Sequence, residues 1–262
     1  MTAASRNAAL ITLSVLAFSC VQAAEIKVLS AVGMRQVMLD LGPKFERSTG
    51  NILKTSFDST GLLAKRVAAG EHVDVVMLNQ SAIDTLVKDG KVRSDSVSHI
   101  ARSVAAVAIR KGAPKPDISS IEGFKQLLLS AKSIARPSPA VGGSSGDHIV
   151  KVLARLGITD QVNAKSVIVT TGHSGQVANS PGEAVANGNA EIALHQLQEL
   201  MAVPGIEIAG PFPGELQGNF TFSAALGSTS KDVRSASALI EFLHTPQARE
   251  VIRAKGMEPV TP

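Results

Sequence analysis

Apolar runs alternate with amphipathic stretches along the chain. In the first third, each of three apolar runs precedes a stretch with helical periodicity. This predicts strand and helix pairs at 25–30 and 34–49, 51–57 and 62–69, and 74–78 and 81–89. Apolar strands that alternate with amphipathic helices are typical of parallel sheets covered on both faces. This part of the chain is therefore predicted to be a βαβαβα unit.

A second α/β series follows a long apolar run at 103–109. The pattern predicts further strands at 132–136, 166–170, 191–194 and 220–225, and helices from 147, over 232–243 and from 246. Two such units predict an α/β fold of two lobes. Each lobe is expected to be a mostly parallel sheet flanked by helices, with a ligand cleft between the lobes. We expect residues 24–104 plus 224–262 to form lobe 1 and residues 105–223 to form lobe 2.

The N-terminus has the composition of a secretory signal. Arg6 precedes an apolar run from Ala8 to Phe18, and a small-residue cleavage site ends at Ala23. The run is shorter than the roughly 20 apolar residues that span a bilayer. We therefore predict that residues 1–23 are a cleaved signal peptide and that the protein is exported.

Composition excludes several classes of function. Cys20 is the only cysteine, so the mature chain would lack disulfides, thiolate catalysis and Cys-ligated metals. The formal net charge of +4 is not concentrated in a Lys/Arg block, and Trp and Tyr are absent, which argues against a nucleic-acid partner. No His, Asp or Glu spacing matches a known metal site, so we expect no metal.

Four loops that follow predicted strands and precede helices carry polar or small residues. The carboxyl ends of parallel strands meet at one edge of a sheet, and helix N-termini donate backbone N–H groups. These loops are therefore expected to line the cleft and to bind a small anion. The candidate substrate-binding residues are Gly33, Met34, Arg35, Ser59, Thr60, Arg136, Ser144, Ser145 and Gln196.

Two of these helix starts, at 59–61 and 142–146, are rich in hydroxyl groups and glycine. Each has a simpler interpretation as an N-cap, which stabilises a helix by about 1 kcal/mol. Their occurrence twice in one chain favours anion capture. Arg35 is unfavourable at a helix N-terminus unless it has an anionic partner, and Arg136 at a strand end offers a planar fork suited to a carboxylate.

Two histidines are candidate catalytic residues. His195 directly follows the predicted strand at 191–194, and strand ends in this architecture point into the cleft. His148 lies in the first turn of the helix predicted from 147. Histidine suits proton transfer near neutral pH, although a single histidine is more often structural than functional.

The segment GGSSG at 142–146 also matches the G-x-S-x-G pattern of hydrolase nucleophile elbows. An elbow places its serine immediately after a strand. Here residues 137–141 separate Ser144 from the strand that ends at Arg136. The sequence therefore favours an anion cradle over an attacking serine.

Three segments resemble the periplasmic molybdate-binding-like substrate-binding proteins of ABC importers. They are KVLSAVGMRQVMLDLGPKFERSTG, TSFDSTGLLAKRVAAGEHVDVVML and LIEFLHTPQAREVIRAKGMEP. The resemblance covers essentially the whole mature chain. It implies a two-lobed, type II binding-protein fold with hinge closure around the ligand, a periplasmic location and a monomer.

The chain departs from this family at two expected ligands. Where the family presents a serine in the first loop, residues 31–34 read Ala-Val-Gly-Met, and where it has a tyrosine, residues 194–195 read Leu-His. The loss of two hydroxyl ligands, together with Arg35, Arg136 and His195, favours a larger carboxylate over a tetrahedral oxyanion.

Two further segments, GGSSGDHIVKVLARLGI and EIALHQLQELMAVPGIEIAGPFPGELQ, are similar to a branch of the family that includes periplasmic aconitate isomerases. This resemblance implies interconversion of trans- and cis-aconitate by an allylic 1,3-proton shift without a cofactor. His195 is the preferred base and His148 the alternative. The other hypothesis is a non-catalytic receptor that passes a tricarboxylate or a molybdate-like oxyanion to a membrane permease.

Overall fold

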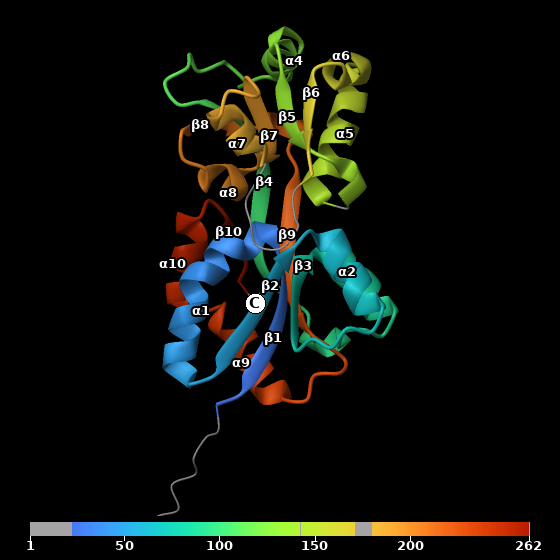
Figure 1. Cartoon of the computed structure of the whole chain (residues 1–262), viewed down its shortest axis with the longest axis vertical. Coiled ribbons are helices and arrows are strands. Elements are labelled where there is room, and N and C mark those ends of the chain that lie inside the picture. The colour runs from blue at the N-terminus through green and yellow to red at the C-terminus, as the bar shows by residue number, and fades with distance from the viewer. Residues whose placement is uncertain (1–22, 142, 171–179, 262) are drawn as a thin grey trace, which may run out of the picture.

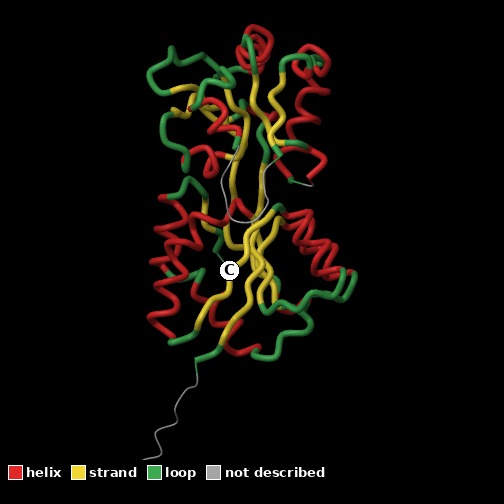
Figure 2. The backbone as a smooth tube through the Cα atoms, viewed as in Figure 1, coloured by secondary structure: helices red, strands yellow, loops and turns green. Residues whose placement is uncertain are grey.

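The computed structural model describes residues 23–141, 143–170 and 180–261, which form two lobes stacked along the long axis of the molecule (Figure 1). In each lobe the strands run through the middle and the helices lie on the outside (Figure 2). This is the mixed α/β, two-lobed architecture predicted from the sequence.

Lobe 1 is built around three parallel strands in the order β2-β1-β3, with the bounds β1 (Glu25–Ala31), β2 (Ile52–Asp58) and β3 (Val75–Asn79). Its helices are α1 (Arg35–Thr49), α2 (Thr60–Ala68), α3 (Gln80–Lys88), α9 (Val233–Phe242) and α10 (Pro246–Ala254). Gly50 ends α1 at a φ of 76°, a left-handed conformation that glycine adopts without steric cost. The predicted βαβαβα unit is confirmed.

Lobe 2 has parallel pairing of β5 with β6 and with β7, and β8 adds an antiparallel strand beside β4. The strands are β5 (Ile134–Pro137), β6 (Ser166–Val169), β7 (Ile192–Gln196) and β8 (Ile206–Pro211). The helices are α4 (Ile121–Ser130), α5 (Ser144–Leu156), α6 (Thr159–Asn163), α7 (Pro181–Ala186) and α8 (Leu197–Met201). The sequence analysis missed the ten-residue helix α4. It also missed the short elements α6, α7, α8 and β8, since runs of five or six residues carry too little periodicity.

Two long strands connect the lobes. β4 (Ser98–Arg110) pairs with β9 (Asn219–Leu226) as far as Val104 and with β7 and β8 from Ala105 onward. β9 also pairs with β3 of lobe 1, and the short β10 (Glu258–Pro259) pairs with β4. β4 therefore changes partners where the first lobe boundary is predicted. The boundaries 24–104 plus 224–262 and 105–223 stay a prediction.

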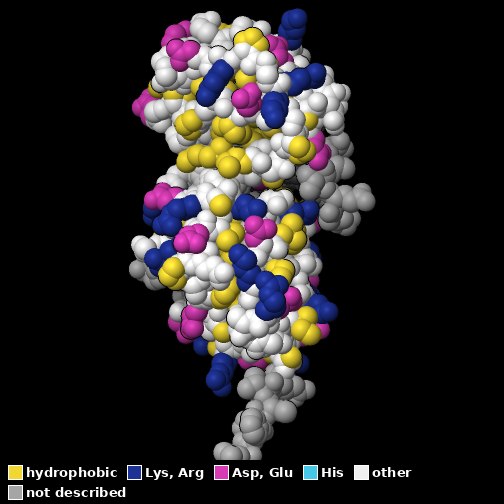
Figure 3. Space-filling view, turned by 90° about the vertical axis from the view of Figure 1, so that its left-hand side faces the viewer, with side chains coloured by type: hydrophobic (Ala, Val, Ile, Leu, Met, Phe, Trp, Pro, Cys, Tyr) yellow, Lys and Arg dark blue, Asp and Glu magenta, His cyan; other side chains and the backbone are white. Residues whose placement is uncertain are grey.

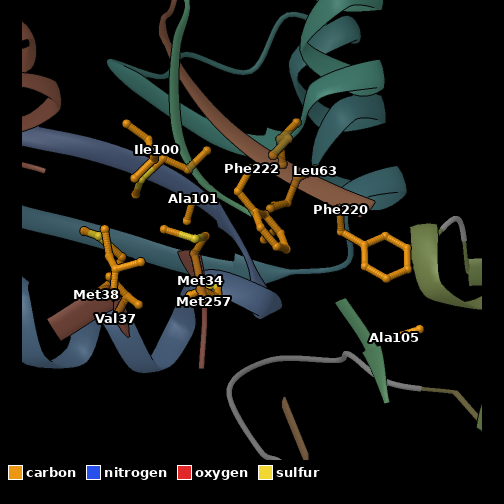
Figure 4. Close-up of a cluster of buried hydrophobic side chains, with 14 of the residues drawn as sticks. Met34, Val37, Met38, Leu63, Ile100, Ala101, Ala105, Phe220, Phe222 and Met257 are labelled. Carbon is orange, nitrogen blue, oxygen red and sulfur yellow. The ribbon is translucent and has the colours of Figure 1, made fainter. Parts of the chain in front are cut away.

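A continuous cluster of buried apolar side chains extends along these connecting strands from lobe 1 into lobe 2. Met34 and Met257 lie near Phe222 of β9, whereas Phe220 on the same strand points toward α5 (Figure 4). Each fully buried side chain of this size stabilises the fold by about 1.5–3 kcal/mol. This packing holds the connecting strands, and with them the loops at the waist of the molecule, in fixed positions.

Candidate functional site

A cleft with contributions from both lobes contains about 440 Å³ of empty space, part of it open to solvent. Figure 3 shows the molecule narrowing between its two lobes. Lobe 1 lines the cleft with Ala31, Val32, Gly33, Ser59 and Thr60, and lobe 2 with Pro137, Gly143, Ser144, Ser145, His195, Gln196 and Glu199; Phe222 of β9 completes the lining.

Gly33 brings the first loop of lobe 1 into close contact with its surroundings. It lies in a 3-10 turn (Val32–Met34) directly after β1. A Cβ atom at Gly33 would lie 2.5 Å from Cζ of Phe222 and 3.0 Å from Nε2 of Gln198. The Gly33 carbonyl oxygen also accepts a hydrogen bond from Gln198 Nε2 at 3.3 Å. A larger residue would displace at least one neighbour.

Ser59 and Thr60 form the start of α2. Ser59 is the N-cap, and its Oγ accepts a hydrogen bond from the Leu62 N–H at 3.3 Å, so the N-cap interpretation is correct. Both side chains are also buried in the cleft lining. The first N–H groups of a helix have no partner within the helix, and they attract anions together with the helix dipole. Capping and anion binding are therefore compatible at this helix start.

The start of α5 faces the cleft from lobe 2. The helix begins at Ser144, three residues before the predicted start, and Gly143 is an N-cap without a side-chain hydrogen bond. A 3-10 turn (Pro139–Val141) separates it from the end of β5. That turn is incompatible with a nucleophile elbow, which needs a direct strand–turn–helix connection. Gly142, part of the motif, lies outside the described residues.

His195 and Gln196 end β7, and both are 4% exposed. The Gln196 backbone N–H donates a hydrogen bond to Nδ1 of His195 at 2.8 Å. Gln198 Nε2 donates to Oε1 of Gln196 at 3.0 Å, and the Ser103 hydroxyl donates to Oε1 of Gln198. This buried chain of hydrogen bonds fixes the end of β7 against β4 and, through Gly33, against the first loop.

Glu199 is a cleft residue that the sequence analysis missed. It lies in α8, its side chain is 19% exposed, and its Oε1 lies 3.5 Å from His195 Nδ1. The i,i+4 spacing from His195 was visible in the sequence, but no helix was predicted there. Phe222 was also missed as a lining residue because it carries no polar signal, whereas Ala31, Val32, Pro137 and Gly143 lie in loops expected to face the cleft but were not named as candidate residues.

Met34 and Arg35 do not belong to the lining of this cleft. Met34 is fully buried in the apolar core. Arg35 opens α1 and places its guanidinium carbon 5.2 Å from the centroid of the Phe57 ring, a cation–π contact. This contact offers an alternative to the anionic partner expected for Arg35. Binding of substrate by Met34 or Arg35 stays a prediction. The position of both residues outside the cleft lining does not support it.

Arg136 is turned away from the cleft, although its neighbour Pro137 lines it. Its Nε donates to Oγ of Ser166 at 2.9 Å and its Nη2 to Oδ1 of Asn163 at 2.8 Å, both within lobe 2. The side chain is 5% exposed, and burial lowers the pKa of Arg136 from its ordinary value. We therefore leave Arg136 out of the proposed site.

His148 also lies outside the lining. Its Nε2 donates to the carbonyl oxygen of Leu216 at 3.0 Å, and its ring packs edge-on against Phe220 with centroids 5.5 Å apart. Burial lowers the pKa of His148 from its ordinary value; the Leu216 hydrogen bond raises it, and Lys151 lowers it further. These contacts give His148 a structural role between α5 and the connecting strand β9.

The cleft offers an anion helix N-termini and hydroxyl groups rather than cationic side chains. Among its described lining residues, His195 and Glu199 are the titratable ones, and neither Lys nor Arg is present. In the part of the chain that the structure describes, no group of three or more His, Cys, Asp or Glu side chains could hold a metal ion. No described helix is long and apolar enough to cross a membrane. The helix starts and hydroxyl groups of the cleft can bind a small anion, and His195 and Glu199 can exchange a proton with it.

Known proteins share this organisation. Residues 26–258 match the model of a family described as bacterial extracellular solute-binding protein. The chain is 34% identical to the aconitate isomerase of a Pseudomonas species over 241 residues, which cover 90% of this chain and 88% of that one. It is 28% identical over 239 residues to the molybdate-binding protein ModA of Azotobacter vinelandii, with 90% of each chain covered.

The fold comparison agrees with the sequence comparison. The structure of the Azotobacter vinelandii periplasmic molybdate-binding protein superimposes with a TM-score of 0.71 at 21% identity, over 90% of this chain and 99% of that one. The predicted two-lobed, type II binding-protein fold and the resemblance to molybdate-binding proteins are confirmed. The match over residues 26–258 and the 34% identity to a relative of similar length establish that the chain belongs to the bacterial extracellular solute-binding proteins.

Proposed function

We propose that this protein is an aconitate isomerase, which interconverts trans- and cis-aconitate in the cleft between the lobes. The relative at 34% identity has this activity by name and covers nearly the same length. Ser59, Thr60, Ser144, Ser145, Gly33 and Gln196 are the proposed substrate-binding residues, and His195 is the proposed catalytic histidine.

Binding of a polyanion is supported by the two helix starts. α2 and α5 direct their first turns to the same cleft, from opposite lobes. Each supplies backbone N–H groups, hydroxyl groups and the positive end of a helix dipole. Carboxylates separated by a short carbon skeleton can each use one of these helix starts.

The single observation that carries the proposal is the presence of His195 and Glu199 in the same cleft, 3.5 Å apart. A carboxylate repels an anionic ligand, so Glu199 lowers the affinity of a receptor for an anion. An enzyme that removes a proton from a bound anion needs such a group within reach of its substrate. The pair therefore favours proton transfer over binding alone.

The reaction requires no oxidant, reductant or cofactor. A base takes a proton from the methylene carbon, whose bonding electrons form a new double bond to the central carbon. The electrons of the old double bond then take a proton at the former alkene carbon. Hydrogen-bond donors to the carboxylate that collects the negative charge would lower the barrier, typically by about 3–4 kcal/mol for each donor.

One observation favours a second function. The described lining has hydroxyl and N–H donors but no Lys or Arg, as expected for a site that selects a desolvated oxyanion through neutral donors. The similarity to ModA at 28% identity is consistent with this alternative. In that case the protein would be a receptor for a molybdate-like oxyanion or a tricarboxylate and would deliver it to a membrane permease.

Both functions fit a periplasmic, monomeric protein that is exported through a cleaved signal peptide. The proposed signal peptide, residues 1–23, falls almost entirely outside the described residues, which begin at residue 23. The proposal of export therefore depends on its sequence and on membership of an extracellular family.

Proton NMR of the purified protein with trans-aconitate in deuterated buffer separates the two functions. Appearance of cis-aconitate at a rate proportional to protein concentration is the expected result. The deuterium content of the product measures how well the cleft excludes water during the reaction. Unreacted trans-aconitate, together with a large increase in melting temperature on addition of molybdate or a tricarboxylate, would instead identify a receptor.

A further inference from the structure

The hydrogen bond to His195 determines which of its nitrogens carries a proton. The Gln196 N–H donates to Nδ1 at 2.8 Å, so Nδ1 is the acceptor. A neutral imidazole has one acceptor and one donor nitrogen. The neutral ring of His195 therefore carries its proton on Nε2.

This tautomer makes His195 a hydrogen-bond donor toward the substrate and not a base. A general base needs a lone pair within reach of the proton that it removes. On His195 the lone pair belongs to Nδ1 and is already used by a backbone N–H. The remaining nitrogen, Nε2, can donate to a carboxylate oxygen of an anion in the cleft.

Glu199 has the free lone pairs that His195 lacks. Its Oε1 lies 3.5 Å from His195 Nδ1, beyond the 2.7–3.2 Å range of N–H···O hydrogen bonds, so the ring does not occupy it. An ionised carboxylate is purely an acceptor. Two other carboxylates lie near the helix starts but do not line the cleft: Asp58, whose Oδ1 accepts the Ser59 N–H at 2.7 Å, and the exposed Asp147.

We propose that Glu199 is the base of the 1,3-proton shift and that His195 is a neutral electrophile. Glu199 removes the methylene proton, the C–H electron pair forms the new double bond, and the proton is delivered to the former alkene carbon. Nε2–H of His195 donates to the carboxylate oxygen that carries the charge in between. A carboxylate base beside a neutral histidine donor is an established division of roles in proton-transfer enzymes. This assignment depends on the isomerase function proposed above.

Four variants of the full-length mature protein test the assignment by their kcat for trans-aconitate. Glu199→Gln keeps the shape but removes the base, and kcat is expected to fall about 10²–10⁴-fold. His195→Leu removes the donor and is expected to reduce kcat about 10²–10³-fold. His195→Gln removes any basic nitrogen but keeps an N–H donor, and its kcat is expected to fall no more than about tenfold. Asp147→Asn is the matched carboxylate control and is expected to change kcat less than about twofold.

The kcat values of the four variants distinguish Glu199 as the base from His195 as the base. If His195 were the base, His195→Gln would be as inactive as His195→Leu and Glu199→Gln would remain active; this pattern overturns the assignment. Circular dichroism and a binding isotherm for cis-aconitate establish that each inactive variant is folded. An inactive wild-type protein overturns the isomerase function and this assignment together, whereas an active wild type with an active Glu199→Gln overturns the assignment alone.

Discussion

The two walls of the cleft differ in chemistry. The wall from lobe 1 consists of small residues and hydroxyls around the start of α2, whereas the wall from lobe 2 repeats this pattern at α5 and adds His195 and Glu199 from β7 and α8. Lobe 1 therefore offers binding groups, and lobe 2 offers binding groups together with groups that exchange protons. A solute receptor needs only what the two walls share, so any catalysis in this fold must come from the additional residues of lobe 2.

The contact at Gly33 links the two walls, since the Gly33 carbonyl oxygen accepts a hydrogen bond from Gln198. Gly33→Ala places a methyl group 2.5 Å from Cζ of Phe222 and 3.0 Å from Nε2 of Gln198, and both neighbours are buried. Overpacking of this kind typically costs about 1–3 kcal/mol. We expect this loss in stability and a fall of roughly 10-fold or more in affinity for aconitate, measured by denaturant unfolding and calorimetric titration.

Gly42→Ala in α1 is the matched control. A Cβ atom there meets only Cδ1 of Leu53 at 3.5 Å, an ordinary contact. Alanine in a helix interior is more stable than glycine by about 0.5–1 kcal/mol. Pro43 follows directly and disfavours the helical conformation of a preceding residue with a Cβ atom, which offsets this gain. Unchanged affinity and little change in stability are expected. If Gly33→Ala behaved like Gly42→Ala, the two walls would not be coupled through this contact.

An Arg136 variant tests whether this buried cation of lobe 2 contributes to substrate binding. Arg136→Met removes hydrogen bonds to Ser166 and Asn163, and loss of hydrogen bonds made by a charged group typically costs about 1.5–3 kcal/mol. We expect this destabilisation in urea unfolding, with KM for trans-aconitate within about twofold of the wild type. A large rise in KM at unchanged stability would return Arg136 to the substrate site.

The serines of the two helix starts are expected to respond differently. Ser59 caps α2 with its side chain, whereas Gly143 caps α5 and leaves Ser144 without a capping role. Ser59→Ala should therefore lower stability by about 1 kcal/mol, and Ser144→Ala should change it by less than about 0.5 kcal/mol. Both should weaken substrate binding. Equal losses of stability in thermal unfolding would contradict the assignment of a capping role to Ser59 and not to Ser144.

The sequence predicted the positions of the loops better than the directions of their side chains. Strand ends and hydroxyl-rich helix starts are local signals, and among the residues that they indicated, Ser59, Thr60, Ser144, Ser145 and His195 line the cleft. Successive residues of a strand point to opposite faces, and β5 is buried along its whole length. Its pattern therefore could not tell that Pro137 faces the cleft and Arg136 does not.

Glu199 could not be identified because its position depends on an element that has no pattern of its own. α8 has only five residues, and its place is set by the pairing of β7 with β4 and by the buried hydrogen bonds of Gln198. These contacts join residues about 95 to 165 positions apart in the chain. Tertiary contacts of this range leave no trace in local periodicity, so the carboxylate of the proposed reaction became visible only in the fold.

His148 of lobe 2 is expected to make the stability of the protein depend on pH. His148 is buried against Phe220 and its pKa is lowered from the ordinary 6.5, so the unfolded chain takes up a proton at this residue at a higher pH than the folded chain. Stability is therefore lost as the pH falls through about 6.5, with a slope of at most about 1.4 kcal/mol per pH unit for one proton.

His148→Gln removes this titration, and its Nε2 can still donate to the Leu216 carbonyl. Urea unfolding between pH 8 and pH 5 should then show a shallower loss of stability than in the wild type. Part of the slope should remain, because burial lowers the pKa of His244 in the same direction. If instead His148→Gln kept the full slope of the wild type, the proton taken up on unfolding would bind elsewhere, and the assignment of this slope to His148 would be wrong.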